Sequence, residues 1–296
     1  MTADTNAGAH VRAELRRFAT AYFDVSGYVT DVAVLFQVLA VALASIPSLR
    51  DLIEPATRWV ILGLAGATPF LRSLSDDTKR TADDILRRIE ISDGLGIPIR
   101  PMELEDVREG AFSGIARIAR RQELDLRPYA SDSPAGPRRL VENTRETAWW
   151  STRLAAELAR WEFVWTIVMV AACVAALVQA ASGPSTLTAA PAANLSRSIV
   201  EFAAAMLVFV FAEGFFRRGR ELAAFATSSE RVLGEADRLL ERERGNGPRI
   251  EQLEAMLLAS KYTIARHASP RLSSIWYRRR RGQLNTAWAN VSAEGQ

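Results

Sequence analysis

Hydrophobic residues gather in four stretches of the chain, residues 32–49, 59–71, 163–181 and 202–216. The stretches form two close pairs, and arginine-rich polar sequence lies outside each pair. A helix of about 20 apolar residues crosses the roughly 30 Å hydrocarbon core of a bilayer. The pattern therefore predicts an all-α integral membrane protein with two transmembrane helical hairpins and long cytosolic helical extensions, rather than a soluble core.

The second stretch, residues 59–71, is the weakest of the four because it is short. It also contains Gly63, Gly66 and Pro69, which disfavour a stiff helix. A re-entrant or interfacial segment is the alternative interpretation of this stretch.

Arginine placement predicts the orientation, because cytosolic loops carry an excess of Lys and Arg. The links within the two pairs carry few basic residues, whereas the outer flanks carry many. Both termini are therefore expected in the cytoplasm, with the chain passing several times through the cell (inner) membrane. The expected segments are a cytosolic N-terminal segment (1–31), a first hairpin (32–72), a cytosolic helical segment (73–160), a second hairpin (161–216) and a cytosolic helical tail (217–296).

The polar segments also show helical periodicity. Apolar residues recur at helical spacing between residues 82 and 89, and Gly94 is expected to end that helix. From Arg138 no Pro or Gly appears before the end of the third stretch, which predicts one long helix continuing into it. A stalk helix is expected from the fourth stretch to Gly245, followed by a further helix over residues 250–266. The apolar faces of these helices are interpreted as packing surfaces.

The middle polar segment offers little else. Residues 97–101, which contain two prolines, must be extended or turning, and a second helical pattern follows around residues 115–118. The acidic pairs at residues 76–77 and 83–84 are interpreted as ordinary solvated charges on a helix.

The average composition does not show that the chain is divided into very apolar and very polar parts. Hydrophobic residues make up 49% and charged residues 24% of the 296 residues, and the mean hydropathy is +0.00. One cysteine, Cys173, and two distant histidines, His10 and His267, make a zinc or iron site improbable. The net charge of +3 does not indicate nucleic-acid binding.

A search for catalytic chemistry finds none of the common motifs. The chain has no phosphate-binding G-x-x-x-x-G-K-[ST], no G-x-S-x-G and no H-E-x-x-H sequence. We therefore expect no enzymatic activity and no cofactor.

Two polar residues within the apolar stretches are candidates for lining a pore, Gln37 and Glu213. A carboxylate at membrane depth costs roughly 2.5–3.5 kcal/mol on insertion scales, so it usually faces a polar interior or a partner. The alternative for Glu213 is a position at the inner interface, close to Arg217 and Arg218. The alternative for Gln37 is a hydrogen bond between helices.

A compact basic patch follows two aromatic residues near the end of the sequence. It comprises Trp276, Tyr277, Arg278, Arg279, Arg280 and Arg281. Arginines attract anionic lipid, and Trp and Tyr favour the membrane interface. Lipid phosphate is the favoured ligand of this patch. A solvated or subunit-facing patch and a site for RNA or a nucleotide messenger are the alternatives.

Three short stretches carry a resemblance to a known family. They are residues 142–151 (ENTRETAWWS), residues 88–94 (RIEISDG) and the spaced residues Tyr262, Arg266, Pro270 and Tyr277. Together with the two hairpins, the helical middle segment and the helical tail, they make the chain resemble the SMODS-associated four-transmembrane effectors. These are predicted pore formers of bacterial nucleotide-messenger defence systems, which act against viruses.

The resemblance implies a non-enzymatic effector that forms a homo-oligomer in the lipid bilayer. A partner nucleotidyltransferase would make a nucleotide second messenger, and the effector would respond by opening a pore that collapses the membrane potential. The alternative function is a non-conducting membrane anchor or scaffold whose cytosolic helices bind partner proteins.

Overall fold

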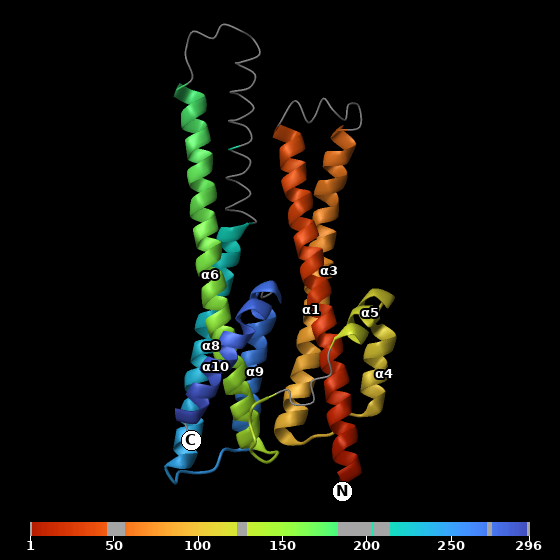
Figure 1. Ribbon diagram of the computed structural model, residues 1–296, viewed down its shortest axis with the longest axis vertical. Helices are drawn as coiled ribbons and strands as arrows, with labels where there is room; N and C mark the ends of the chain where they lie inside the picture. The colour runs from red at the N-terminus through yellow and green to blue at the C-terminus, as the bar shows by residue number, and fades with distance from the viewer. Residues whose placement is uncertain are drawn as a thin grey trace. The chain divides into compact units, whose positions relative to one another are not determined.

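The computed structural model describes residues 2–45, 57–122, 129–182, 203, 214–270 and 274–294. These residues form eight helices and no strand (Figure 1), so the all-α prediction is confirmed. The helices are α1 (Thr2–Ser45), α3 (Thr57–Leu95), α4 (Pro101–Gly110), α5 (Ser113–Arg121), α6 (Pro137–Ser182), α8 (Phe215–Arg244), α9 (Gln252–Ala268) and α10 (Ser274–Glu294).

Contacts divide the chain into two compact units. Unit 1 comprises Met1–Gly27, Asp76–Ala156 and Ala223–Gln296, and unit 2 comprises Tyr28–Ser75 and Glu157–Leu222. Helices α1, α3, α6 and α8 each contribute residues to both units, because each unit boundary falls inside a helix. The boundaries lie a few residues from those of the segments expected from the sequence. The assignment of those segments to membrane and cytosol stays a prediction.

An apolar core in unit 1 joins the first part of α1 to α3, α4 and α5. Leu15 and Phe18 of α1 pack with Ile89 of α3, Leu104 of α4 and Ile115 of α5. On α1, residues 15, 18, 19 and 22 recur every three or four positions, so they form one stripe along the helix. Burial of this stripe keeps the N-terminal part of α1 helical.

Helix α4 is absent from the sequence-based expectation. Residues 96–100 are non-helical, as expected for the region of the two prolines, but a helix then begins at Pro101. Proline suits the first position of a helix, because the backbone N–H that it lacks would have no intrahelical acceptor there. Leu104 on the buried side of α4 then fixes this short helix against the core.

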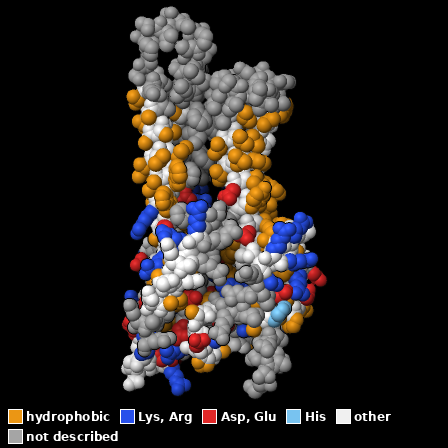
Figure 2. Space-filling view, viewed as in Figure 1, with side chains coloured by type: hydrophobic (Ala, Val, Ile, Leu, Met, Phe, Trp, Pro, Cys, Tyr) orange, Lys and Arg blue, Asp and Glu red, His pale blue; other side chains and the backbone are white. Residues whose placement is uncertain are grey.

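Unit 2 contains two pairs of helix segments, in which α1 runs beside α3 and α6 beside α8 (Figure 1). The hydroxyl oxygens of Thr30 and Ser75 are 2.7 Å apart between α1 and α3. Between α6 and α8, the rings of Phe163 and Phe216 meet edge to face with centroids 6.1 Å apart. Hydrophobic side chains predominate on the face of these segments that Figure 2 shows.

The second apolar stretch is a continuous part of α3, which corrects the expectation that Gly63, Gly66 and Pro69 disfavour a stiff helix. Proline removes one backbone donor from a helix, and neighbouring Ser or Thr side chains can satisfy carbonyls in that turn. The Thr68 hydroxyl donates to the Leu64 carbonyl at 2.9 Å, one turn before. One lost hydrogen bond is thus insufficient to end the helix.

Within the described ranges, two helices are long and apolar enough to cross a membrane, over Gly8–Ala40 in α1 and Pro137–Ala175 in α6. Their most apolar windows are 17% and 22% buried, whereas the core helix of a soluble protein is mostly buried. This favours association with a membrane on length and composition alone. Helix α3 does not reach the same apolarity, and most of the fourth apolar stretch lies outside the described residues.

Candidate functional site

A row of buried polar residues follows α3 through unit 1. Lys79, Asp83, Glu90 and Asp93 are 6%, 0%, 1% and 6% exposed. At 100° per residue these four positions fall on one face of the helix, next to the face that enters the apolar core. Asp83 is therefore a buried charge, and its interpretation as a solvated one is wrong.

The Asp83 carboxylate lies between two cations. Lys79 Nζ donates to Asp83 Oδ2 at 2.8 Å, and Arg266 Nε of α9 lies 3.0 Å from Asp83 Oδ1. Lys79 Nζ also donates to the Arg266 carbonyl at 2.7 Å, while Arg266 Nη2 donates to the Asp83 carbonyl at 2.8 Å. Contacts between side chains and contacts to backbone carbonyls thus both join α9 to α3.

Glu90 lies farther along the same face, where Thr144 Oγ1 of α6 donates to Glu90 Oε1 at 2.8 Å. Burial raises the pKa of Glu90, and the nearby charges of Arg266 and Arg87 only partly counteract this effect. The net result is a carboxyl group that ionises less readily than an exposed glutamate.

Tyr262 completes the contact between α9 and α6. Its hydroxyl oxygen lies 2.7 Å from Ser151 Oγ, and Tyr262 is 1% exposed. Burial raises the pKa of Tyr262 to about 12, so the phenol stays protonated and can donate at neutral pH. The Arg266 guanidinium also lies 5.4 Å from the centre of the Tyr262 ring.

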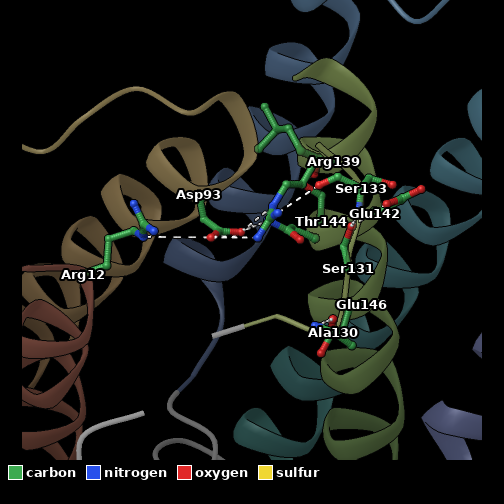
Figure 3. Close-up of polar contacts among 11 residues, drawn as sticks. Arg12, Asp93, Ala130, Ser131, Ser133, Arg139, Glu142, Thr144 and Glu146 are labelled. Atoms are coloured by element: carbon green, nitrogen blue, oxygen red, sulfur yellow. Dashed lines mark hydrogen bonds and ion pairs between the residues drawn. The ribbon is translucent and has the colours of Figure 1, made fainter. Parts of the chain in front are cut away.

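Asp93 ends the row with three donors around one carboxylate (Figure 3). Arg139 of α6 donates from Nε to Oδ2 at 3.0 Å and from Nη2 to Oδ1 at 3.1 Å, and Asn143 Nδ2 donates to Oδ2 at 2.9 Å. Arg12 Nε of α1 lies 3.9 Å from Oδ1. The next residue, Gly94, permits this approach, since a Cβ there would lie 2.8 Å from Leu140 Cα.

Residues of the segment before α6 form hydrogen bonds with side chains of α6 itself (Figure 3). Ser131 Oγ donates to Glu142 Oε2 at 2.5 Å, and the Ala130 N–H donates to Glu146 Oε2 at 2.9 Å. Burial raises the pKa of Glu142, but hydrogen bonds from Ser131, Ser133 and Arg138 outweigh it, so the pKa is lowered overall. Glu142 therefore accepts these bonds as a carboxylate.

A tryptophan cluster joins α6 to α10. The rings of Trp149 and Trp288 have centroids 5.3 Å apart, and the Arg153 guanidinium lies 4.4 Å from the centre of the Trp149 ring. Arg145 lies 5.4 Å from the Trp288 ring and donates to Asp237 Oδ1 of α8 at 2.6 Å. Trp149, at 4% exposed, thus belongs to the interior of unit 1.

The buried polar network on α3 connects helices instead of presenting a reactive group. Its carboxylates are each hydrogen-bonded to side chains of α3, α6 or α9, and breaking one partnership would leave a buried charge uncompensated. Among the described residues, no group of three or more His, Cys, Asp or Glu side chains is placed to hold a metal ion. The arrangement is suited to holding α3, α6 and α9 in one fixed packing.

Gln37 is the one pore-lining candidate that the structure describes. Its Oε1 accepts a hydrogen bond from Arg72 Nη2 at 2.8 Å, between α1 and α3 in unit 2. This is the interhelical contact that the sequence leaves open as the alternative. Glu213 lies outside the described residues, so its position stays a prediction.

The predicted lipid patch begins α10 and is described in part. Arg279 is exposed, and Arg280 Nη1 donates to Gln283 Oε1. The described side chains do not include those of Trp276, Tyr277, Arg278 and Arg281.

A second basic surface, which was not predicted from the sequence, lies on α5. An open hollow of about 380 Å³ is lined by Ser113, Ala116, Arg117, Arg120 and Arg121. Among the described residues these three arginines form no ion pair, so the hollow has a positive surface.

Sequence reasoning missed the network because hydrophobic periodicity does not register buried charges. A usable signal was nevertheless present. The stretches that carry the family resemblance contain Glu90, Asp93, Asn143, Thr144, Ser151, Tyr262 and Arg266. The structure brings all three stretches together in unit 1. No protein-family model matches the chain, and comparisons with curated proteins and with solved structures find no match.

Proposed function

We propose that this chain is a membrane-embedded effector that forms a gated pore, with unit 1 controlling unit 2. The apolar helix segments of unit 2 would form two transmembrane hairpins in the inner membrane, and the helices of unit 1 would lie in the cytoplasm with both termini. The pore would assemble from several copies of the chain.

One observation carries the proposal: four helices belong to both units. A helix transmits displacement along its axis, because each turn is hydrogen-bonded to the next. Rearrangement of the buried network on α3 would therefore displace the unit 2 parts of α3 and α6. Buried ionic networks have few alternative satisfied arrangements, which suits an element with two discrete states.

The contact between Gln37 and Arg72 supports a polar path through the first hairpin. Placing an arginine near the hydrocarbon core costs free energy unless water or a hydrogen-bond partner is available. Here the side-chain amide of Gln37 accepts a hydrogen bond from Arg72. Rupture of this bond on gating would expose two polar groups that could line a path for ions. Glu213 is the corresponding candidate in the second hairpin.

The biological setting follows from the family resemblance alone. A nucleotide second messenger, made by a partner nucleotidyltransferase, would be the trigger, and loss of membrane potential would be the outcome in antiviral defence. Independently of the resemblance, the basic charge of Arg278, Arg279, Arg280 and Arg281 beside Trp276 and Tyr277 supports binding of lipid phosphate at the inner leaflet.

Electrical recording from the chain in liposomes tests the proposal. Asp83→Asn, which weakens the network in unit 1, should raise the frequency of opening, while Gln37→Leu should change the conductance of each opening. Silence of the wild-type chain and of both variants would contradict a pore and favour the non-conducting anchor or scaffold. In that case Gln37→Leu should leave cellular activity intact.

A further inference from the structure

Helix α9 carries an apolar stripe that the described part of the chain leaves exposed. Leu253, Leu257 and Ile264 are 65%, 53% and 70% exposed, with Met256 beside them at 39%. Spacings of three, four and seven residues place these side chains on one face of α9. The opposite face enters the interior of unit 1 through Ala255, Leu258 and Tyr262. Both faces of this helix are therefore apolar, as in a helix with a partner on each side.

The pattern of charges beside the stripe is self-complementary. On one edge, Glu254 lies toward the N-terminal end of α9 and Lys261 toward the C-terminal end. On the neighbouring α8 they pair with charges of opposite sign, since Arg242 donates to Glu254 at 2.6 Å and Lys261 donates to Glu235 at 2.6 Å. Each end of this edge therefore carries a partly exposed ion pair, and an antiparallel copy would set the Glu254–Arg242 pair of one chain against the Lys261–Glu235 pair of the other.

We propose that α9 is a subunit interface at which two copies of this chain pair in antiparallel orientation. A two-fold axis near residues 258–259 sets Leu253 of one copy against Ile264 of the other. By symmetry this contact forms twice in the pair. Leu257 then faces Ser260 of the other copy, and the small serine permits a close approach between the helices. The same axis brings Glu254 toward the other copy's Lys261. An isologous contact of this kind is the commonest way in which identical chains pair.

This inference rests on the proposed oligomeric effector for its role, but the pairing itself can be tested without any measure of conductance. The chain has one cysteine, Cys173, so Cys173→Ala gives a background in which introduced cysteines report alone. Leu253→Cys and Ile264→Cys are placed on two differently tagged chains that are co-expressed and mildly oxidised in the membrane. Both positions are exposed, so these variants should fold.

The antiparallel pair predicts a cross-link between the two different chains, because residue 253 meets residue 264 of the other copy. Chains that carry only Leu253→Cys should not cross-link, since two such residues would be about 16 Å apart along the axis at 1.5 Å per residue. Leu257→Glu should abolish the mixed cross-link. Lys261→Glu should reduce it roughly two- to tenfold, because it replaces two weak ion pairs with repulsion. Met102→Cys on α4, also exposed, is the matched control and should not cross-link with Ile264→Cys.

Absence of the mixed cross-link, or its equal formation with Met102→Cys, would overturn the proposal, as would dominant Leu253→Cys self-pairing, which indicates parallel helices. The outcome is separable from the proposed function. A mixed cross-link without conductance would leave the interface standing and reject the pore, whereas conductance without the cross-link would do the reverse.

Discussion

Asp83 is a fully buried carboxylate in unit 1 that lies between two cations. Its carboxylate faces Lys79 and Arg266 with no exposure to solvent, so the two cations depend on it for their charge balance. Removing one member of a buried ion group leaves the remaining charges uncompensated, which costs about 3–5 kcal/mol.

Asp83→Asn should therefore lower the free energy of unfolding by about 3–5 kcal/mol, measured by thermal or denaturant unfolding in detergent. The neighbouring Asp84→Asn is a matched control. Asp84 is exposed, and its Oδ1 lies 3.5 Å from His267 Nε2, so its replacement should change stability by less than about 0.5 kcal/mol. Equal effects of the two substitutions would show that Asp83 is accessible to water in the native state.

Glu90 makes the stability of unit 1 depend on pH. Burial raises its pKa above the ordinary value of 4.5, so the folded chain holds this proton more tightly than the unfolded chain. The stability that this group contributes is present at low pH and is lost as the pH rises from about the ordinary value through the raised one.

Glu90→Gln, which keeps an acceptor for Thr144 Oγ1, should remove this part of the pH dependence. The melting temperature of the wild type relative to Glu90→Gln should fall as the pH rises from about 4.5, and the two curves should run parallel at higher pH. Glu109→Gln, at an exposed position on α4, should follow the wild type throughout. A constant offset between wild type and Glu90→Gln over the whole range would contradict the assignment.

At the scale of elements, the close approach of α3 and α6 depends on a missing side chain at Gly94. A Cβ there would meet Leu140 Cα and Cβ at 2.8 Å, too close to fit without backbone movement. Gly94→Ala should therefore lower the unfolding free energy by about 1–3 kcal/mol.

Gly234 in α8 provides the opposite control for this substitution. A Cβ at Gly234 meets nothing within 4 Å, so Gly234→Ala should gain about 0.5–1 kcal/mol from helix propensity. The melting temperatures of the two variants should move in opposite directions. A gain in stability for Gly94→Ala would mean that α3 and α6 are farther apart than described.

The long helices were largely predictable, because their signals are local. The absence of Pro and Gly after Arg138 predicted a helix that the structure begins at Pro137 and ends at Ser182, and Gly245 follows α8 where the stalk was expected to end. Pro69 misled the prediction because one lost hydrogen bond is a small term in a helix of 39 residues. The tail over residues 217–296 was expected to be helical, but the bounds of α10 within it were not predicted because its periodic signal is weak.

The buried network was not predictable from periodicity, because its members look like surface residues when read one helix at a time. Asp83 and Glu90 are acids on a helix rich in charge, and only contacts from α6 and α9 make them interior residues. Partners 54 and 183 positions away in the sequence leave no local signature. Gln37 was singled out as a polar group in an apolar stretch, its bond to Arg72 was not foreseen, and its role in lining a pore stays a prediction.

At the scale of the molecule, the proposed topology places the link between the second pair of apolar stretches and the start of α10 on opposite faces of the membrane. In a Cys173→Ala background, Ser185→Cys should react with a membrane-impermeant maleimide from the periplasmic face, and Arg279→Cys only from the cytoplasmic face. Right-side-out and inside-out vesicles distinguish the two. Labelling of both positions from one face would reject the two-hairpin arrangement, and a chain that stays dispersed without detergent would reject membrane insertion altogether.

The distance in sequence between Asp83 and Arg266 has a consequence for biosynthesis. At about 5–20 residues per second, a ribosome needs roughly 10–40 seconds to pass from one to the other. Two of the four apolar stretches precede Asp83, and the other two are synthesised during that interval, while the buried Asp83 carboxylate still lacks the Arg266 guanidinium. On the proposed function, the apolar stretches would enter the membrane before the contact between α3 and α9 can form, and a chain truncated before α9 would lack the contact expected to keep the pore closed.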